Sequence, residues 1–356
     1  MFELNENKLD DFINNYPKNI PLILYGYGGG IIDLPKLFME NNINIIAICD
    51  RDKEKQGGYY CGIPVMSFED ALEKFDNFNV YISVSNYFDE IEQYLKKYIK
   101  SDRIFSYGRK KNMSTNEYTS FLKDNERELE KIYQNLSDST SKKTMENVIK
   151  GSITNDLKYF KEVCCDNQYF ADDIIKLSSE EIFVDAGAFN GDTISQFALK
   201  VNDKFSKIYA FEPDVSSLSK LLEMIDNYKH GDKIEVIKAG VFSSTTYIGF
   251  NDDVSKGSHV ETKNDVINKI KVVSLDGYIN DKVTFIKMDV EGCELEALKG
   301  SVNIIRKYKP KLAICIYHKL EDILEIPHFI MDLGLDYKYF MRHHTNSVDE
   351  TVFYAI

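Results

Sequence analysis

Short apolar runs alternate with amphipathic segments over residues 20–108. The segment that begins at Ser67 has a good N-cap residue, followed by Glu69 and Asp70 in what would be the first helical turn. Strands that alternate with helices in this way predict a parallel sheet. The candidate strands cover residues 20–28, 43–50 and 79–85. We therefore expect an N-terminal α/β domain over residues 1–108.

The same alternation resumes at Glu181 and continues to the end of the chain. The candidate strands cover residues 181–187, 207–213, 234–241, 282–290 and 310–318. The last two strand-like runs, 336–344 and 350–356, have only a short gap between them. Such a gap suits an antiparallel pair, whereas the earlier strands have room for helical crossovers. The pattern predicts a second α/β domain over residues 181–356, with an antiparallel pair that closes its sheet.

Residues 109–180 have a different pattern. They are rich in charge, but apolar positions still recur at helical intervals, and several serine and threonine residues could cap helices. This pattern favours a helical connector between the two domains.

Composition and charge narrow the class of protein. The 356-residue chain has a formal charge of −13 and no long basic run, which argues against a nucleic-acid substrate. No apolar run is long enough to span a bilayer, and the acidic N-terminus does not resemble a signal peptide, so we expect a cytoplasmic protein. The six cysteines form no Cys-x-x-Cys pair, which favours reduced core residues over a zinc site.

The glycine turn after the strand at 181–187 indicates a cofactor site. It lacks the G-x-G-x-x-G spacing of a dinucleotide site. Asp185 and Asp192 would repel a pyrophosphate, whereas the sulfonium and ammonium groups of S-adenosylmethionine would be attracted. Glu212 ends the next strand and could accept hydrogen bonds from both ribose hydroxyls; the alternative is that it caps the following helix. The turn therefore favours S-adenosylmethionine.

Several ordered motifs resemble those of the FkbM family of S-adenosylmethionine-dependent methyltransferases. They are the loop Asp185–Gly191, FEPD at 211–214, IKMDVEGCELEALKG at 286–300, ICIYHK at 314–319 and the terminal segment from Arg342, and the resemblance runs from about residue 135 to the end. It implies a class I methyltransferase fold, a Rossmann-like seven-stranded sheet with the last strand antiparallel. Phe189 departs from the glycine that is common in methyltransferase loops.

The resemblance and the loop together define the expected cofactor site. Its expected residues are Asp185, Gly187, Ala188, Asn190, Gly191, Asp192, Thr193, Glu212, Pro213, Gly240 and Asp289. By resemblance, the acceptor is a hydroxyl on a sugar, a glycan precursor or a related natural product.

We expect the methyl acceptor to bind at the carboxyl ends of the candidate strands 282–290 and 310–318. Asp289, Glu291 and His318 could supply a general base or orient the acceptor. Asp289 could instead cap a helix or hold the cofactor's amino group, Glu291 could stabilise a helix dipole, and His318 could be a buried structural histidine. A divalent metal is not favoured, because no fixed ligand spacing requires one. We expect His343 and His344 at the pocket rim, and the polar segment 251–261, with Ser258 and His259, as a loop near the substrate or in solvent.

The N-terminal glycine turn is less specific. Gly26, Gly28, Gly29 and Gly30 lie in it, but a full dinucleotide motif would need glycine at Ile31, and Asp50 ends the following strand. The segment CGIPVMSFEDAL resembles part of small Rossmann-like domains attached to sugar-modifying enzymes. Three uses stay open: holding a nucleotide-linked substrate, holding a nicotinamide cofactor, or serving as an interaction module. A homo-oligomer is also compatible with the sequence.

Overall fold

The computed structural model describes residues 7–27, 34–84, 88–107, 115–251, 259–261 and 269–356. It is a mixed α/β protein with three sheets, which confirms the fold class at that level. In the part described, no helix has the length and apolar character that a bilayer crossing requires.

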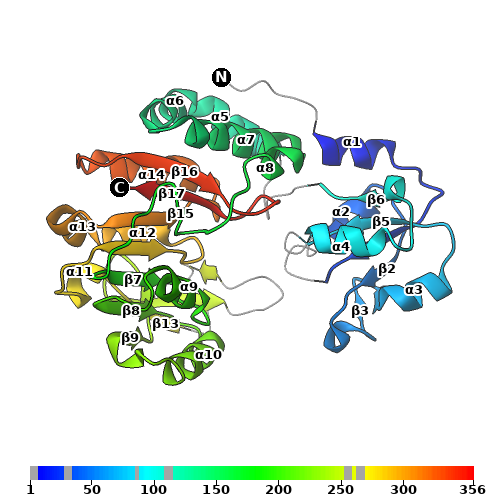
Figure 1. Cartoon of the computed structure of the whole chain (residues 1–356). Helices are drawn as coiled ribbons and strands as arrows, with labels where there is room; N and C mark the ends of the chain where they lie inside the picture. Colours follow the sequence, from blue (N-terminus) through cyan, green and yellow to red (C-terminus); the bar gives the residue numbers. More distant parts are fainter. Residues whose placement is uncertain (1–6, 28–33, 85–87, 108–114, 252–258, 262–268) are drawn as a thin grey trace.

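The N-terminal sheet has the strand order β3-β4-β2-β1-β5-β6 (Figure 1). Its strands are β1 (Leu22–Tyr25), β2 (Ile45–Cys49), β3 (Tyr59–Tyr60), β4 (Ile63–Met66), β5 (Asn79–Ile82) and β6 (Ile104–Phe105). All neighbours pair in parallel except β3 and β4. The helices are α1 (Lys8–Asn15), α2 (Leu34–Glu40), α3 (Phe68–Lys74) and α4 (Phe88–Leu95). Ser67 caps α3 by accepting the Asp70 N–H, as predicted.

The C-terminal sheet has seven strands in the order β16-β17-β15-β14-β7-β8-β9. They are β7 (Ile182–Ala186), β8 (Lys207–Phe211), β9 (Ile234–Ile237), β14 (Phe285–Met288), β15 (Lys311–Cys315), β16 (Tyr339–His343) and β17 (Thr351–Ala355). β17 is antiparallel to both of its neighbours, so the predicted closing pair is present. A four-stranded sheet lies beside it and comprises β10 (Gly240–Val241), β11 (Thr246–Asn251), β12 (His259–Glu261) and β13 (Lys269–Val273).

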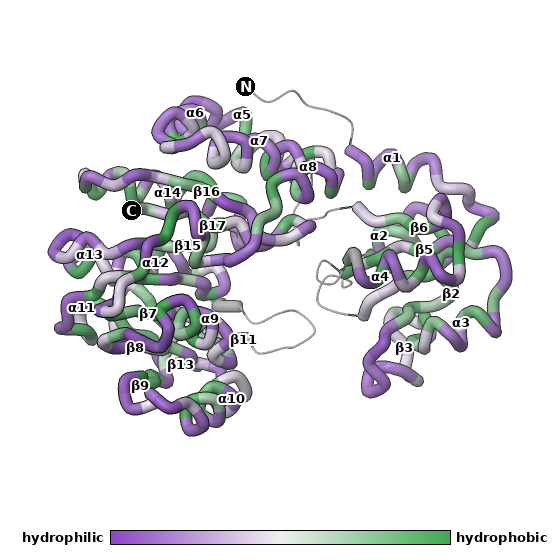
Figure 2. Tube along the Cα trace, in the orientation of Figure 1, coloured by the Kyte–Doolittle hydropathy of each residue, from purple (hydrophilic) through white to green (hydrophobic). Residues whose placement is uncertain are grey.

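Strand alternation gives the seven-stranded sheet an apolar core on each face. Phe183 and Phe285 belong to one core, whereas Val184 and Ile286 belong to the other. The helices of this part are α9 (Asp192–Lys200), α10 (Val215–Asp226), α11 (Leu275–Tyr278), α12 (Glu294–Lys299), α13 (Val302–Tyr308) and α14 (Asp322–Asp332). Figure 2 shows the apolar strands inside and polar residues on the outer helix faces.

The segment expected as a helical connector is helical, and it also contributes to the second core. Its helices are α5 (Thr115–Asp124), α6 (Glu126–Asn135), α7 (Ser139–Thr154) and α8 (Lys158–Lys161). Leu129, Met145 and Ile149 lie in the same cluster as Met341 of β16. The Ser137 N–H donates to Tyr339 O at 2.8 Å. These helices therefore pack beside the edge strand β16 of the seven-stranded sheet (Figure 1).

The first helix links the N-terminal sheet to this helical layer. Asn7 Nδ2 donates to Ile153 O at 3.3 Å, and Asn155 Nδ2 donates to Asn7 Oδ1 at 3.0 Å. Lys161 Nζ lies 4.5 Å from the centre of the Phe88 ring.

Arg342 joins the helical layer to the edge of the seven-stranded sheet. Its guanidinium lies 2.7 Å from Asp138 Oδ2 and 2.6 Å from Asp173 Oδ2, and it donates to Ser141 Oγ. Asp138 is also the N-cap of α7. Arg342 itself is buried.

We predict that Arg342→Ala lowers the free energy of unfolding by about 2–3 kcal/mol. This loss is smaller than that expected for a fully buried ion pair, because the carboxylates of Asp138 and Asp173 are partly exposed to solvent. Urea unfolding measures the change. Arg306→Ala, on the exposed face of α13, is the matched control and should change stability by less than about 0.5 kcal/mol. An equal effect of the two substitutions would contradict the role assigned to Arg342.

Candidate active site

The glycine loop follows β7 and approaches the end of β14 very closely. Gly187 has a φ of +88°, and a Cβ at this position would lie 1.8 Å from Asp289 O. The Gly187 N–H donates to Phe211 O at 3.0 Å, which ties the loop to β8. Only glycine combines this backbone conformation with this approach. The loop then turns into α9, which begins at Asp192.

A buried ion pair lies under this loop. Lys287 on β14 and Asp185 on β7 are register partners, and Lys287 Nζ lies 3.0 Å from Asp185 Oδ1. Lys287 Nζ also donates to Gly187 O at 2.6 Å. Burial raises the pKa of Asp185 to about 6, although the Lys287 ammonium opposes this shift. Asp185 is therefore buried against Lys287, and it supports the glycine loop through this lysine.

Glu212 follows β8 and is held by the backbone. Its carboxylate accepts the N–H groups of Phe189 and Asp214, both at 2.8 Å. Burial raises the pKa of Glu212 to about 7, and these two hydrogen bonds oppose the shift. Each oxygen keeps a further lone pair for a donor in the cleft.

A cleft with a volume of about 610 Å³ lies at the carboxyl ends of β7, β8 and β14. This is where ligands bind in open α/β sheets. The sequence-predicted residues that line it are Gly187, Asp192, Thr193, Glu212, Pro213, Gly240, Asp289 and Glu291. Asp185, Ala188, Asn190, Gly191 and His318 are outside this lining. Ala188 and Gly191 are buried in the loop, where they shape the turn and do not face the cleft.

Asp289 is the acidic centre of the acceptor side. Its Oδ2 accepts the Tyr169 hydroxyl at 2.6 Å, and its Oδ1 accepts the Tyr317 hydroxyl at 3.5 Å. Burial opposes ionisation, but the charges of Lys287 and His318 outweigh it and hold the pKa of Asp289 below its usual value. Asp289 is therefore a stable carboxylate at the cleft wall.

His318 lies behind Asp289, among carboxylates. Its Nε2 is 3.4 Å from Asp289 Oδ1 and 3.7 Å from Glu291 Oε2, and its Nδ1 is 3.0 Å from Glu294 Oε1. Burial opposes its charging, but these carboxylates raise the pKa of His318 to about 10. His318 is therefore an imidazolium at neutral pH and has no free nitrogen lone pair with which to accept a proton.

Glu294 holds His318 and the turn before α12. It is fully buried, and its Oε1 accepts the N–H of Val290 at 2.8 Å. Glu291 is exposed at the cleft, with a φ of +54°. The segment that contains Asp289, Glu291 and Glu294 thus surrounds one cation, His318, with three acids.

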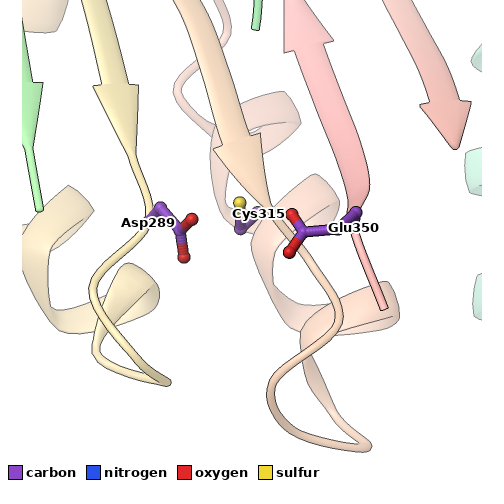
Figure 3. Close-up of side chains that lie close together, drawn as sticks. All are labelled: Asp289, Cys315 and Glu350. Atoms are coloured by element: carbon purple, nitrogen blue, oxygen red, sulfur yellow. The ribbon is translucent and has the colours of Figure 1, made fainter. Parts of the chain in front are cut away.

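Glu350 brings a further carboxylate to the same wall (Figure 3). Its side chain contacts Gln168 Nε2 and accepts the Tyr317 hydroxyl at 3.2 Å. Ligand atoms of Asp289, Cys315 and Glu350 lie within 4.8 Å of one another, as do those of Asp289, Glu294 and His318. Asp289 and Glu350 already accept hydrogen bonds from tyrosine hydroxyls. Asp289 and Glu294 also lie beside the imidazolium of His318. We therefore assign no metal ligands.

The two histidines expected at the pocket rim are elsewhere, so that expectation is wrong. His343 is fully buried, with its ring nitrogens 2.9 Å from Thr351 Oγ1 and 2.7 Å from Ser347 O. His344 Nε2 lies 2.8 Å from the Tyr354 hydroxyl oxygen. Both satisfy polar groups around the closing strands.

The sequence reasoning missed five residues of the site: Tyr169, Lys287, Glu294, Tyr317 and Glu350. A lysine inside an otherwise apolar buried strand was a usable signal, because such a charge requires a partner. The other four carried no local signal, since their roles depend on segments that meet only in the folded protein.

The N-terminal turn is only partly described. Asp50 accepts the N–H groups of Tyr27 at 2.6 Å and Asp52 at 2.9 Å, so its carboxylate organises the local backbone. Gly28, Gly29, Gly30 and Ile31 are outside the described residues, as are residues 252–258 with Ser258. The backbone of His259 is part of β12, but its side chain is outside the description.

Comparison with known proteins defines the class of the C-terminal part. Residues 185–341 match the family model of the methyltransferase FkbM domain. A crystal structure of methyltransferase FkbM from Methylobacillus flagellatus KT has the same fold, with a TM-score of 0.72 and 24% identity over 98% of this chain and 93% of that one. Residues 185–341 therefore correspond to an FkbM methyltransferase domain, as the motifs indicated.

A curated relative shares part of this domain. Hexuronic acid methyltransferase AglP from Haloferax volcanii is 30% identical over 142 residues, which is 38% of this chain. The match spans 57% of the length of that relative.

The carboxylates around His318 make its contribution to stability dependent on pH. The pKa of His318 rises from 6.5 to about 10 on folding, so its stabilisation is complete below pH 6.5 and is lost as the pH rises through about 10. We predict that the stability difference between wild type and His318→Gln is larger at about pH 6 than at about pH 10. Urea unfolding at the two pH values tests this, with His230→Gln as the control. A difference that grows with pH would contradict the imidazolium assignment.

Proposed function

We propose that the protein is an S-adenosylmethionine-dependent O-methyltransferase. The observation that carries the proposal is the cleft at the carboxyl ends of β7, β8 and β14, with Glu212 on one side and Asp289 on the other. The proposal includes two structural assignments. The C-terminal part has a class I methyltransferase fold, and both α/β parts are Rossmann-like.

The residues of the cleft fit S-adenosylmethionine. Glu212 would accept the ribose hydroxyls through the lone pairs that the backbone leaves free. Asp192 and Asp289 provide negative charge for the ammonium and sulfonium groups. Gly187 keeps the loop close to β14, so no side chain fills that part of the cleft. When bound, the cofactor supplies an electrophilic methyl group.

The acceptor is proposed to be a hydroxyl on a sugar or glycan precursor. The relative's name describes a hexuronic acid methyltransferase, which supports a carbohydrate acceptor. Asp289 and Glu291 would orient the hydroxyl, and His318 would hold these two carboxylates in place. His318 is thus proposed as a positioning residue, which revises the base role considered from the sequence.

The N-terminal α/β part is proposed to hold the nucleotide-linked or glycan part of the substrate. The Methylobacillus structure aligns with this part as well, which supports a shared two-part architecture. A nicotinamide cofactor at the N-terminal turn is the alternative.

Calorimetry tests the cofactor. We predict that S-adenosylmethionine binds at about pH 8, where Glu212 is ionised, and that Glu212→Gln weakens its binding about 10- to 100-fold. The reason is that two hydrogen bonds to a charged acceptor become bonds to a neutral one. Glu223→Gln, on the exposed face of α10, should leave the affinity unchanged. Binding of NAD in the absence of any binding of S-adenosylmethionine would contradict the proposal.

Methyl transfer tests the acceptor class. We predict that the protein transfers a tritiated methyl group from S-adenosylmethionine to a glycan or nucleotide-sugar fraction of a cell extract. Mass spectrometry of the product should show the mass of one added methylene unit, and periodate or NMR analysis should place it on a sugar oxygen. Transfer to nucleic acid or protein alone would contradict the proposed acceptor.

A further inference from the structure

Glu350 stands at the wall of the cleft, opposite the end of β14. It immediately precedes β17, and it lines the cleft with Asp289. Figure 3 shows the carboxylates of Asp289 and Glu350 on either side of the Cys315 thiol. An oxygen of each carboxylate lies within 4.8 Å of the other, so the two groups are close enough to share one substrate group, although Asp289 follows β14 and Glu350 precedes β17.

The environments of the two carboxylates differ. Asp289 accepts the Tyr169 hydroxyl and faces the Lys287 ammonium, which stabilise its charge. Glu350 contacts neutral donors, Gln168 and Tyr317. Two neighbouring carboxyl groups whose surroundings separate their proton affinities are typical of an acid–base site.

Burial raises the pKa of Glu350 to about 7, and the negative charge of Asp289 adds to this shift. Gln168 lowers the pKa by hydrogen bonding, Asp349 raises it, and His318 lowers it. The other titratable groups that face Glu350 are Tyr169, Cys315 and Tyr317. A carboxylate with a pKa near neutrality accepts a proton more readily than Asp289 does.

The backbone at this position also departs from the usual conformation. Glu350 has a φ of +67°, a region that non-glycine residues seldom occupy. Tyr169, Phe189 and Glu291, which also line the cleft, have φ values of 63°, 47° and 54°. Such strained residues cluster at functional sites, where the surrounding structure holds them.

We propose that Glu350 is the general base that removes the proton from the acceptor hydroxyl during methyl transfer. This inference rests on the proposed O-methyltransferase function. As the acceptor oxygen forms its bond to the methyl carbon, the sulfur–methyl bond breaks and its electron pair returns to sulfur. The hydroxyl proton passes to the Glu350 carboxylate and then to solvent. S-Adenosylhomocysteine and the methyl ether are the products.

The other candidates for the base are less suitable. His318 lacks a free lone pair at neutral pH and lies outside the cleft lining. Asp289 is held as a weakly basic carboxylate. A hydroxyl acceptor requires a base, whereas a carboxylate acceptor is already ionised and requires none. The base role proposed for Glu350 therefore applies to an alcohol acceptor and not to a carboxylate acceptor.

The test compares Glu350→Gln with wild type and with Asp349→Asn, the adjacent acid. The acceptor probes are methyl β-glucoside and methyl β-glucuronide, and the protein is treated with EDTA so that no metal supplies the base. We expect Glu350→Gln to lose at least about 100-fold in kcat with little change in S-adenosylmethionine affinity. Wild-type kcat should rise with pH through about 7, and Glu350→Gln should lack this rise. Asp349→Asn should retain the rate and the rise with pH, with the midpoint moved slightly lower because the Asp349 charge contributes to the raised pKa of Glu350.

A second readout does not depend on turnover. In the S-adenosylhomocysteine complex, the infrared difference spectrum between wild type and Glu350→Gln should contain a carboxyl band that titrates near pH 7. A midpoint below about pH 5.5 overturns the proposal. If neither pyranoside is methylated, this midpoint decides the outcome.

The outcomes separate the two proposals. If wild type methylates a hydroxyl and Glu350→Gln loses less than about 10-fold, the base assignment fails and the methyltransferase function stands. Methylation of the glucuronide carboxylate alone also overturns the base assignment. If wild type does not bind S-adenosylmethionine, the proposed function fails and the base assignment fails with it.

Discussion

The ammonium group of Lys287 is the interaction on which the architecture of the site depends. Lys287 is buried on β14, where its ammonium pairs with Asp185 of the adjacent strand β7 and donates to the carbonyl oxygen of Gly187. Its Nζ also lies 5.0 Å from the centre of the Tyr169 ring. One buried cation therefore fixes the glycine loop, supports the tyrosine that contacts Asp289, and helps to keep Asp289 ionised. Removal of such a charge would leave its carboxylate partner buried and uncompensated.

The cleft has two sides with different chemistry. On the cofactor side, two backbone N–H groups of the neighbouring turns donate to the Glu212 carboxylate and hold its side chain in one conformation. On the acceptor side, the carboxylates differ in proton affinity because their partners differ: Asp289 faces cations, whereas Glu350 faces neutral donors. The division of roles that we propose follows from these surroundings.

Much of the fold could be predicted from the sequence because its signals are local. The Ser67 cap, the apolar strands and the closing antiparallel pair all depend on short stretches of chain. The expectation that Asp185 faces the ligand depended on where β7 ends. The strand continues to Ala186, so Asp185 is a residue of β7 and its buried side chain pairs with Lys287 of β14.

The acceptor side was harder to predict because its contacts are long-range. Tyr169 and Asp289 are 120 residues apart in the chain, and Gln168 and Glu350 are 182 apart. The role of His318 also depended on tertiary structure, since its sequence neighbours alone do not show that three acids surround it. The helical segment 115–161 shows the same limit: its helices were expected, but their packing beside the edge strand β16 was not.

A crystal structure of the complex with S-adenosylhomocysteine tests the central claim most directly. The account predicts that the nucleoside occupies the cleft, with its ribose hydroxyls on the Glu212 carboxylate and its sulfur toward Asp289. A nucleoside bound elsewhere, or a ribose that makes no contact with Glu212, would contradict it.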